Sequence, residues 1–75
     1  MAQWQDCIEE RKDVMLGKPV FKGTRITVQH VLEELGGGMS LPDLLDNYPT
    51  LKPEYIRAAM QYAAAVVAMD QSIYE

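Results

Sequence analysis

Two helix-breaking sites divide the second half of the chain and constrain its fold more than any other feature. The first is the triplet Gly36-Gly37-Gly38, and the second is Tyr48-Pro49, whose proline disfavours helical dihedrals at the tyrosine. With only 75 residues, the chain forms one small domain that buries about 60% of its unfolded surface. The three helices delimited by these breaks must therefore make most of the core.

The first predicted helix runs from Val28 to Leu35. Thr27 stands where an N-cap hydroxyl can accept a bond from a backbone N–H, and the glycine triplet offers a left-handed C-cap. Apolar residues recur on one helical face at Val28, Val31, Leu32 and Leu35.

The second predicted helix runs from Leu41 to Asn47. Ser40 followed by Asp43 resembles a capping box, and Pro42 suits the first turn because its missing N–H costs nothing there. Its apolar face consists of Leu41, Leu44 and Leu45.

The third predicted helix is the longest and runs from Pro53 to Met69. The expected apolar stripe is Ile56, Met60, Ala63 and Val67. The segment AMQYAAAVVAMD is almost uncharged, and a helix that is apolar on most sides is usually buried on most sides. We therefore expect a dimer or partner face made of Tyr55, Tyr62, Ala65, Val66 and Met69.

Short extended segments are expected before the first helix, at Cys7-Ile8, Val14 to Leu16 and Val20-Phe21. Lys22-Gly23 indicates a turn, and Pro19 restricts its strand to an edge or a terminus. The predicted fold is mainly α, in one domain: short strands and turns in 1–26, a three-helix, homeodomain-like helix-turn-helix core in 27–70, and a tail in 71–75.

The net charge is −4, yet no acid lies between Val14 and Leu32. Nucleic-acid binders present a basic face, which only this N-terminal segment could supply. For contact with DNA, the third helix would offer Arg57 and Gln61, with Lys52 near its start. The alternative is that the lysines are solvated turn residues and that a carboxylate or backbone carbonyls hold the Arg25 guanidinium. The candidate nucleic-acid contacts are Lys18, Lys22, Arg25, Lys52, Arg57 and Gln61.

The pattern predicts no enzyme, no metal site and no cofactor. His30 is the only histidine and has no nucleophile motif beside it, so it is interpreted as a surface helix residue rather than a general base. The single cysteine, Cys7, is interpreted as an inert small side chain, with a redox or intermolecular role as the alternative. No apolar run is long enough to span a membrane and the N-terminus lacks a signal-peptide layout, so we expect a cytoplasmic protein.

Two separated motifs resemble the bacterial family known as domain of unknown function 433. The first is GKPVFKGTRITV, and the second is NYPTLKPEYIRAAMQYA, in matching order and distance over about Leu16 to Ala64. The positions that carry the resemblance as structural motif residues are Gly17, Pro19, Gly23, Thr24, Arg25, Tyr48 and Pro49.

The resemblance implies a homeodomain-like core preceded by short strands, and no catalytic residues. It also implies an antitoxin role, in which the chain binds a PIN-like ribonuclease toxin and operator DNA. The alternative is a homodimeric protein-interaction module without DNA affinity. Neither hypothesis involves a small-molecule substrate or a membrane.

Overall fold

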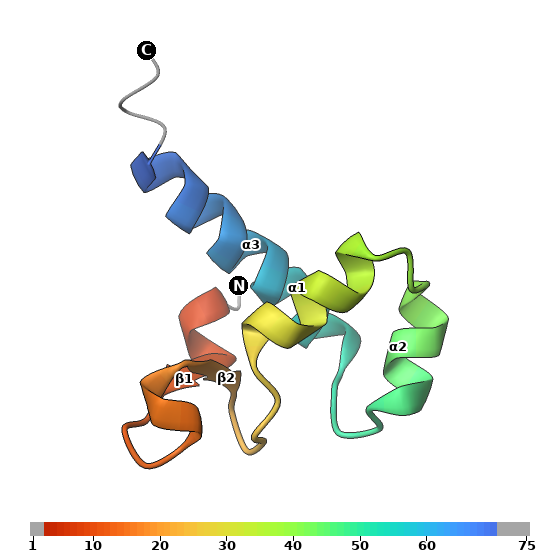
Figure 1. The fold of residues 1–75 in the computed structure, drawn as a ribbon, viewed down its shortest axis with the longest axis horizontal. Helices are drawn as coiled ribbons and strands as arrows, with labels where there is room; N and C mark the ends of the chain where they lie inside the picture. Colours follow the sequence, from red (N-terminus) through yellow and green to blue (C-terminus); the bar gives the residue numbers. More distant parts are fainter. Residues whose placement is uncertain (1–2, 71–75) are drawn as a thin grey trace.

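The computed structural model describes residues 3–70 as three helices preceded by a small two-stranded sheet (Figure 1). Helix α1 (Val28–Gly36) lies between the sheet and helix α2 (Leu41–Asn47), and helix α3 (Pro53–Asp70) crosses behind α1. The mainly helical fold predicted from the sequence is confirmed. The tail expected at 71–75 lies outside the described residues.

The sheet pairs strand β1 (Ile8–Glu10) with strand β2 (Pro19–Phe21) in antiparallel register, with Ile8 opposite Phe21. Pro19 begins its strand, as its missing N–H requires. A sheet of two strands is not stable alone, so it depends on the helices packed against it. Short 3₁₀ helices precede each strand, η1 (Trp4–Asp6) and η2 (Met15–Gly17).

The expectation of an extended segment from Val14 to Leu16 is wrong. Met15 and Leu16 adopt left-handed dihedrals, with φ of 50° and 57°, and the Leu16 side chain is 95% exposed. Because β1 already pairs directly with β2, this apolar run falls in the loop that reverses the chain between them. Ile26 also lies outside the strands, although its carbonyl accepts a hydrogen bond from the Phe21 N–H at 3.1 Å.

A tight turn connects β2 to α1. Gly23 has φ of 79°, which a side chain would resist. The Thr24 hydroxyl donates to the Phe21 carbonyl at 2.8 Å and accepts from the Ile26 N–H at 3.1 Å. The turn is thus held by one side chain, and it delivers Thr27 to the start of α1.

The helix boundaries agree with the sequence prediction, because the capping residues act as expected. Thr27 accepts a hydrogen bond from the His30 N–H at 3.0 Å, and Ser40 accepts one from the Asp43 N–H at 3.3 Å. At the end of α1, Gly38 has φ of 104°. The Gly38 N–H donates to the Leu35 carbonyl, and the Met39 N–H donates to the Glu34 carbonyl. These two bonds are the Schellman pattern.

The core gathers around Phe21, whose side chain is fully buried. The ring stacks on that of Tyr55 in α3, with centroids 5.5 Å apart and planes 7° from parallel. The other fully buried large side chains are Leu44, Val20, Val28 and Val31.

The apolar stripe expected along α3 is largely wrong. Ile56 is buried, but the side chains of Met60 and Val67 are 55% and 51% exposed. Instead the N-terminal segment packs against α3 beside Ala58, and both Ala58 and Ala59 are buried. Alanine fits a buried or an exposed face equally well, so the alanine-rich pattern did not indicate which side would be covered.

We expect Phe21→Ala to lower the free energy of unfolding by about 3–5 kcal/mol, because it leaves a cavity where β2 meets α3. Urea denaturation followed by circular dichroism measures the change. The control is Met60→Ala, which removes an exposed side chain and should change stability by less than about 0.5 kcal/mol. Equal effects of the two substitutions would contradict the core described above.

Candidate interaction surfaces

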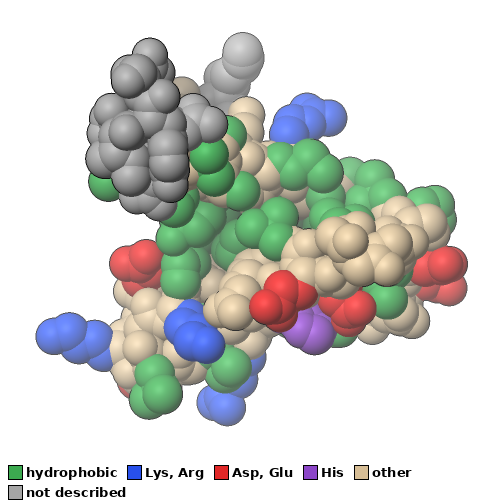
Figure 2. All heavy atoms as spheres, turned by 45° about the horizontal axis from the view of Figure 1, so that its top comes forward, with side chains coloured by type: hydrophobic (Ala, Val, Ile, Leu, Met, Phe, Trp, Pro, Cys, Tyr) green, Lys and Arg blue, Asp and Glu red, His purple; other side chains and the backbone are tan. Residues whose placement is uncertain are grey.

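The candidate nucleic-acid contacts do not form one basic face. All six are exposed, but they come from separate segments: the loop before β2, the turn after it, and the start of α3. Lys22 and Lys52 are near enough to Cys7 to act on its thiol, whereas Arg25 lies near His30 and Tyr48. Figure 2 shows the Lys and Arg side chains at separate places around the edge of the molecule.

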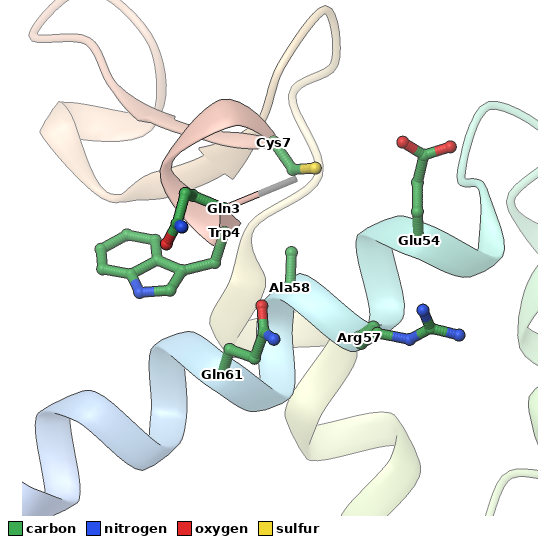
Figure 3. Close-up of a pocket in the computed structure, with 7 residues that line it drawn as sticks. All are labelled: Gln3, Trp4, Cys7, Glu54, Arg57, Ala58 and Gln61. Atoms are coloured by element: carbon green, nitrogen blue, oxygen red, sulfur yellow. The ribbon is translucent and has the colours of Figure 1, made fainter. Parts of the chain in front are cut away.

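Helix α3 offers few groups for contact with nucleic acid. Among the described residues of α3, Arg57 alone has a cationic side chain, and it is exposed. The acidic Glu54 lies one turn before it. Figure 3 shows the N-terminal segment beside this part of α3, with Gln61 directed towards that segment and the Arg57 guanidinium directed away from it. The surface between the N-terminal segment and this part of α3 is therefore a shallow concavity lined by Trp4, Cys7 and Ala58. It is not a basic surface of the kind that contacts nucleic acid.

The two tyrosines expected on the partner face pack within their own chain. Tyr55 stacks on Phe21, and its hydroxyl donates to the Lys22 carbonyl at 3.4 Å. The Tyr62 ring meets that of Trp4 edge to face, with centroids 5.1 Å apart. Trp4, for which the sequence suggested no role, thus holds the N-terminal segment against α3.

The other members of the expected partner face lie further along α3. Ala65 is half-buried, while the side chains of Val66 and Met69 are 41% and 78% exposed. This half of the helix extends away from the rest of the domain (Figure 1). No charged side chain occurs between Ala59 and Met69.

A groove joins this half of α3 to α1. Its apolar lining residues are Pro19, Val28, Leu32, Tyr62, Ala63, Val66 and Val67. Gln29 and Glu33 of α1 provide its polar part. Figure 2 shows hydrophobic side chains gathered across the centre of this face. Contiguous apolar surface of this kind is typical of protein-binding sites.

A hydrogen-bonded cluster joins α1 to the α2–α3 connection. The Tyr48 hydroxyl donates to Glu34 Oε1 at 3.1 Å, and His30 Nε2 lies 2.7 Å from that hydroxyl and 3.2 Å from the carboxylate. Partial burial, and then the hydrogen bond and negative charge of Glu34, raise the pKa of the Tyr48 hydroxyl. The hydroxyl therefore remains a protonated donor. Sequence reasoning placed His30 alone on the surface, because nothing in the spacing of 18 residues links it to Tyr48.

The predicted tie between Arg25 and a carboxylate or backbone carbonyls is wrong. Its guanidinium is exposed and makes no hydrogen bond or ion pair with any residue in 3–70. Glu34 on α1 is bound to Tyr48 and His30, and Glu33 accepts a bond from Gln29 at 3.2 Å. The other motif residues at this junction have structural roles, but Arg25 has none.

Cys7 lies buried beneath the concavity of Figure 3. Burial raises the pKa of its thiol, the negative charges of Glu54 and Asp6 raise it further, and Lys22 and Lys52 oppose them. The thiol is therefore held in its protonated, unreactive form.

In residues 3–70, no three His, Cys, Asp or Glu side chains gather in a way that could hold a metal ion. None of the described helices has the length and apolar character needed to cross a bilayer.

Comparison with known proteins identifies the family. The model of the protein family of unknown function DUF433 matches residues 8–63, and the chain belongs to this family. The uncharacterized protein y4eO of Sinorhizobium fredii is 34% identical over 65 residues, which are 87% of this chain but 29% of that protein. The chain thus spans less than a third of the length of this relative.

A solved structure shares the fold. The crystal structure of a DUF433 member from Anabaena variabilis superposes with a TM-score of 0.78 at 29% sequence identity. The match covers 95% of this chain and 71% of the other. The family resemblance inferred from the two motifs is therefore confirmed.

We expect the Cys7 thiol to react with iodoacetamide at pH 8 at least ~10-fold more slowly in the folded chain than in urea. The reason is that the thiolate is the nucleophile, and burial together with Glu54 and Asp6 disfavours it. Mass spectrometry of timed samples measures the rate. Glu54→Gln should accelerate the reaction modestly in the folded chain and leave it unchanged in urea. Equal rates in the folded and unfolded chains would contradict this description of Cys7.

Proposed function

We propose that this DUF433 member is a non-enzymatic, antitoxin-type regulator that binds a PIN-like ribonuclease toxin through the groove between α1 and α3. The observation that carries the proposal is the apolar lining of this groove beside a half-exposed and uncharged stretch of helix. An amphipathic helix of a partner can bury its apolar face in such a groove.

The exposed valines support an interaction role for this surface rather than a purely structural one. Val66 and Val67 both line the groove, with side chains 41% and 51% exposed. Burying apolar surface contributes roughly 25 cal/mol per Å², so covering these side chains would stabilise a complex. Glu33 at the edge of the groove could pair with a cation of the partner.

The charge distribution favours a protein partner over DNA. Phosphate contacts depend on cations or positioned amides, and α3 exposes Arg57 next to the acidic Glu54. DNA binding by this chain alone is therefore the weaker hypothesis. Filter binding to the DNA upstream of its own gene at two salt concentrations tests it, because phosphate contacts must strengthen as salt falls.

A second copy of the chain is the other candidate for the groove. The same uncharged stretch from Ala59 to Met69 could pack against its counterpart without repulsion between like charges. This arrangement is the homodimeric interaction module. Sedimentation of the isolated chain distinguishes the two cases, because only the homodimer doubles the mass without a partner.

We expect Val67→Glu to weaken toxin binding at least ~10-fold, because binding would bury an unpaired carboxylate in an apolar groove. The chain is co-expressed with the product of the neighbouring reading frame, and the readouts are growth, inhibition of RNA cleavage and affinity by calorimetry. The matched control is Ala64→Glu, which adds the same charge to the same helix at an exposed residue that does not line the groove.

Circular dichroism establishes that both variants are folded. A neighbouring product without ribonuclease activity, or one that the wild-type chain does not inhibit in molar excess, would contradict the toxin-binding proposal. Equal weakening by both substitutions would contradict the assignment to this groove.

A further inference from the structure

We propose that the N-terminal segment, residues 3–7, sets the shape of the groove between α1 and α3 and thereby its choice of partner. Trp4 is the residue through which the segment acts, because it fixes the ring of Tyr62, which lines the groove. Trp4 does not line the groove, so it is a positioning residue. The inference rests on the proposed function, in which this groove binds the partner, and it adds what determines the fit.

The Tyr62 ring belongs to both structures. It meets the Trp4 indole edge to face, with centroids 5.1 Å apart and planes 74° from parallel. The same residue lines the groove together with Leu32 of α1 and Val66 of α3. A change in the position of Trp4 therefore reaches the groove through one side chain.

Packing, and not hydrogen bonding, holds the Tyr62 ring. Within residues 3–70 its hydroxyl makes no hydrogen bond, whereas those of Tyr48 and Tyr55 donate to Glu34 and to the Lys22 carbonyl. Tyr62 is only half-buried. Edge-to-face contact between aromatic rings is favourable beyond the area that it buries, because the positive edge of one ring meets the negative face of the other. The orientation of Tyr62 thus depends on Trp4.

The N-terminal segment can act on this ring because its own attachment to α3 is packing as well. Within residues 3–70, the hydrogen bonds of residues 3–6 stay inside the segment: the Asp6 N–H donates to the Gln3 carbonyl at 2.9 Å, and the Cys7 N–H donates to the Trp4 carbonyl at 3.0 Å. The Cys7 carbonyl accepts from the Lys22 N–H at 2.9 Å, which ties the end of the segment to the sheet. A concavity of about 310 Å³ remains between the segment and α3 (Figure 3).

The position of the segment in the sequence suits a determinant of partner choice. The DUF433 model matches residues 8–63, so residues 3–7 lie outside the matched range. The groove residues from Pro19 to Ala63 lie inside it. A protein discriminates between partners by a difference in affinity, and the shape of the binding surface sets that difference. In this chain a residue outside the family pattern adjusts a groove that is largely inside it.

The first test needs no partner. Methyl ¹H–¹³C spectra of the full chain are compared for the wild type and Trp4→Leu, which keeps an apolar side chain but loses the ring. We expect shifts at Leu32 and Val66, because the Tyr62 ring moves, and no shift at Leu44, which is buried in α2 away from the groove. Trp4→Phe keeps an aromatic neighbour and should produce smaller shifts.

A double-mutant comparison separates the action of Tyr62 from a direct effect of the indole. In a Tyr62→Leu background, Trp4→Leu should no longer shift the signals of Leu32 and Val66, because the two residues act as a pair. Circular dichroism establishes that the variants are folded. Unchanged groove signals in Trp4→Leu, or shifts that persist in the Tyr62→Leu background, would overturn the inference.

The second test uses the product of the neighbouring reading frame and measures affinity by calorimetry. Trp4→Leu should weaken binding at least ~5-fold, and Trp4→Phe less than about 2-fold. Gln5→Ala changes an exposed residue of the same segment that lines neither concavity, and it should bind as the wild type does. Equal weakening by Trp4→Leu and Gln5→Ala would overturn the inference. A wild-type chain that does not bind contradicts the proposed function instead, and the methyl spectra then decide whether Trp4 shapes the groove.

Discussion

The contact between Phe21 and Tyr55 is the interaction on which the rest of the structure depends. It joins the short sheet to α3, and neither part is sufficient alone. A two-stranded sheet is unstable in water, and Tyr55 is the residue of α3 whose ring stacks on the sheet. The backbone of Phe21 is also fixed by hydrogen bonds. Its N–H donates to the Ile26 carbonyl, and its carbonyl accepts from both the N–H and the hydroxyl of Thr24. The turn, the sheet and the helix therefore stabilise one another.

This arrangement leaves two surfaces without partners in the described part of the chain. Because the N-terminal segment covers the first half of α3 through Trp4 and Tyr62, the second half extends beyond the body with its valines exposed. Arg25 makes no ion pair with a carboxylate of residues 3–70, and Glu34 is bound to Tyr48 and His30. The first surface is apolar and suits a protein, and the second leaves the Arg25 guanidinium exposed.

The helices could be predicted from the sequence because local chemistry determines their ends. Thr27, Ser40 and the glycine triplet cap their helices through bonds within a few residues, so the boundaries follow from spacing alone. The strand pairing was harder to predict from the sequence. Val14 to Leu16 has the composition of a strand, but the register of Ile8 with Phe21 places it in a loop.

The candidate sites were harder to predict for the same reason. The tyrosines of α3 were expected to face a partner, yet their neighbours Phe21 and Trp4 come from distant parts of the chain. Arg25 was expected to be paired, but the acids of α1, Glu33 and Glu34, have partners 4 and 14 residues away. Only the tertiary structure shows which charged groups remain unpaired.

Hydrogen exchange tests the central claim most directly, namely that the groove between α1 and α3 is a protein-binding surface. The chain is compared alone and in the presence of the product of the neighbouring reading frame, which is the proposed partner, with exchange resolved by mass spectrometry of peptides. The account predicts slower exchange in 28–33 and 62–67, and unchanged exchange in β1 and β2. Protection confined to the segment from Lys18 to Arg25, or no protection with the proposed partner in excess, would contradict it.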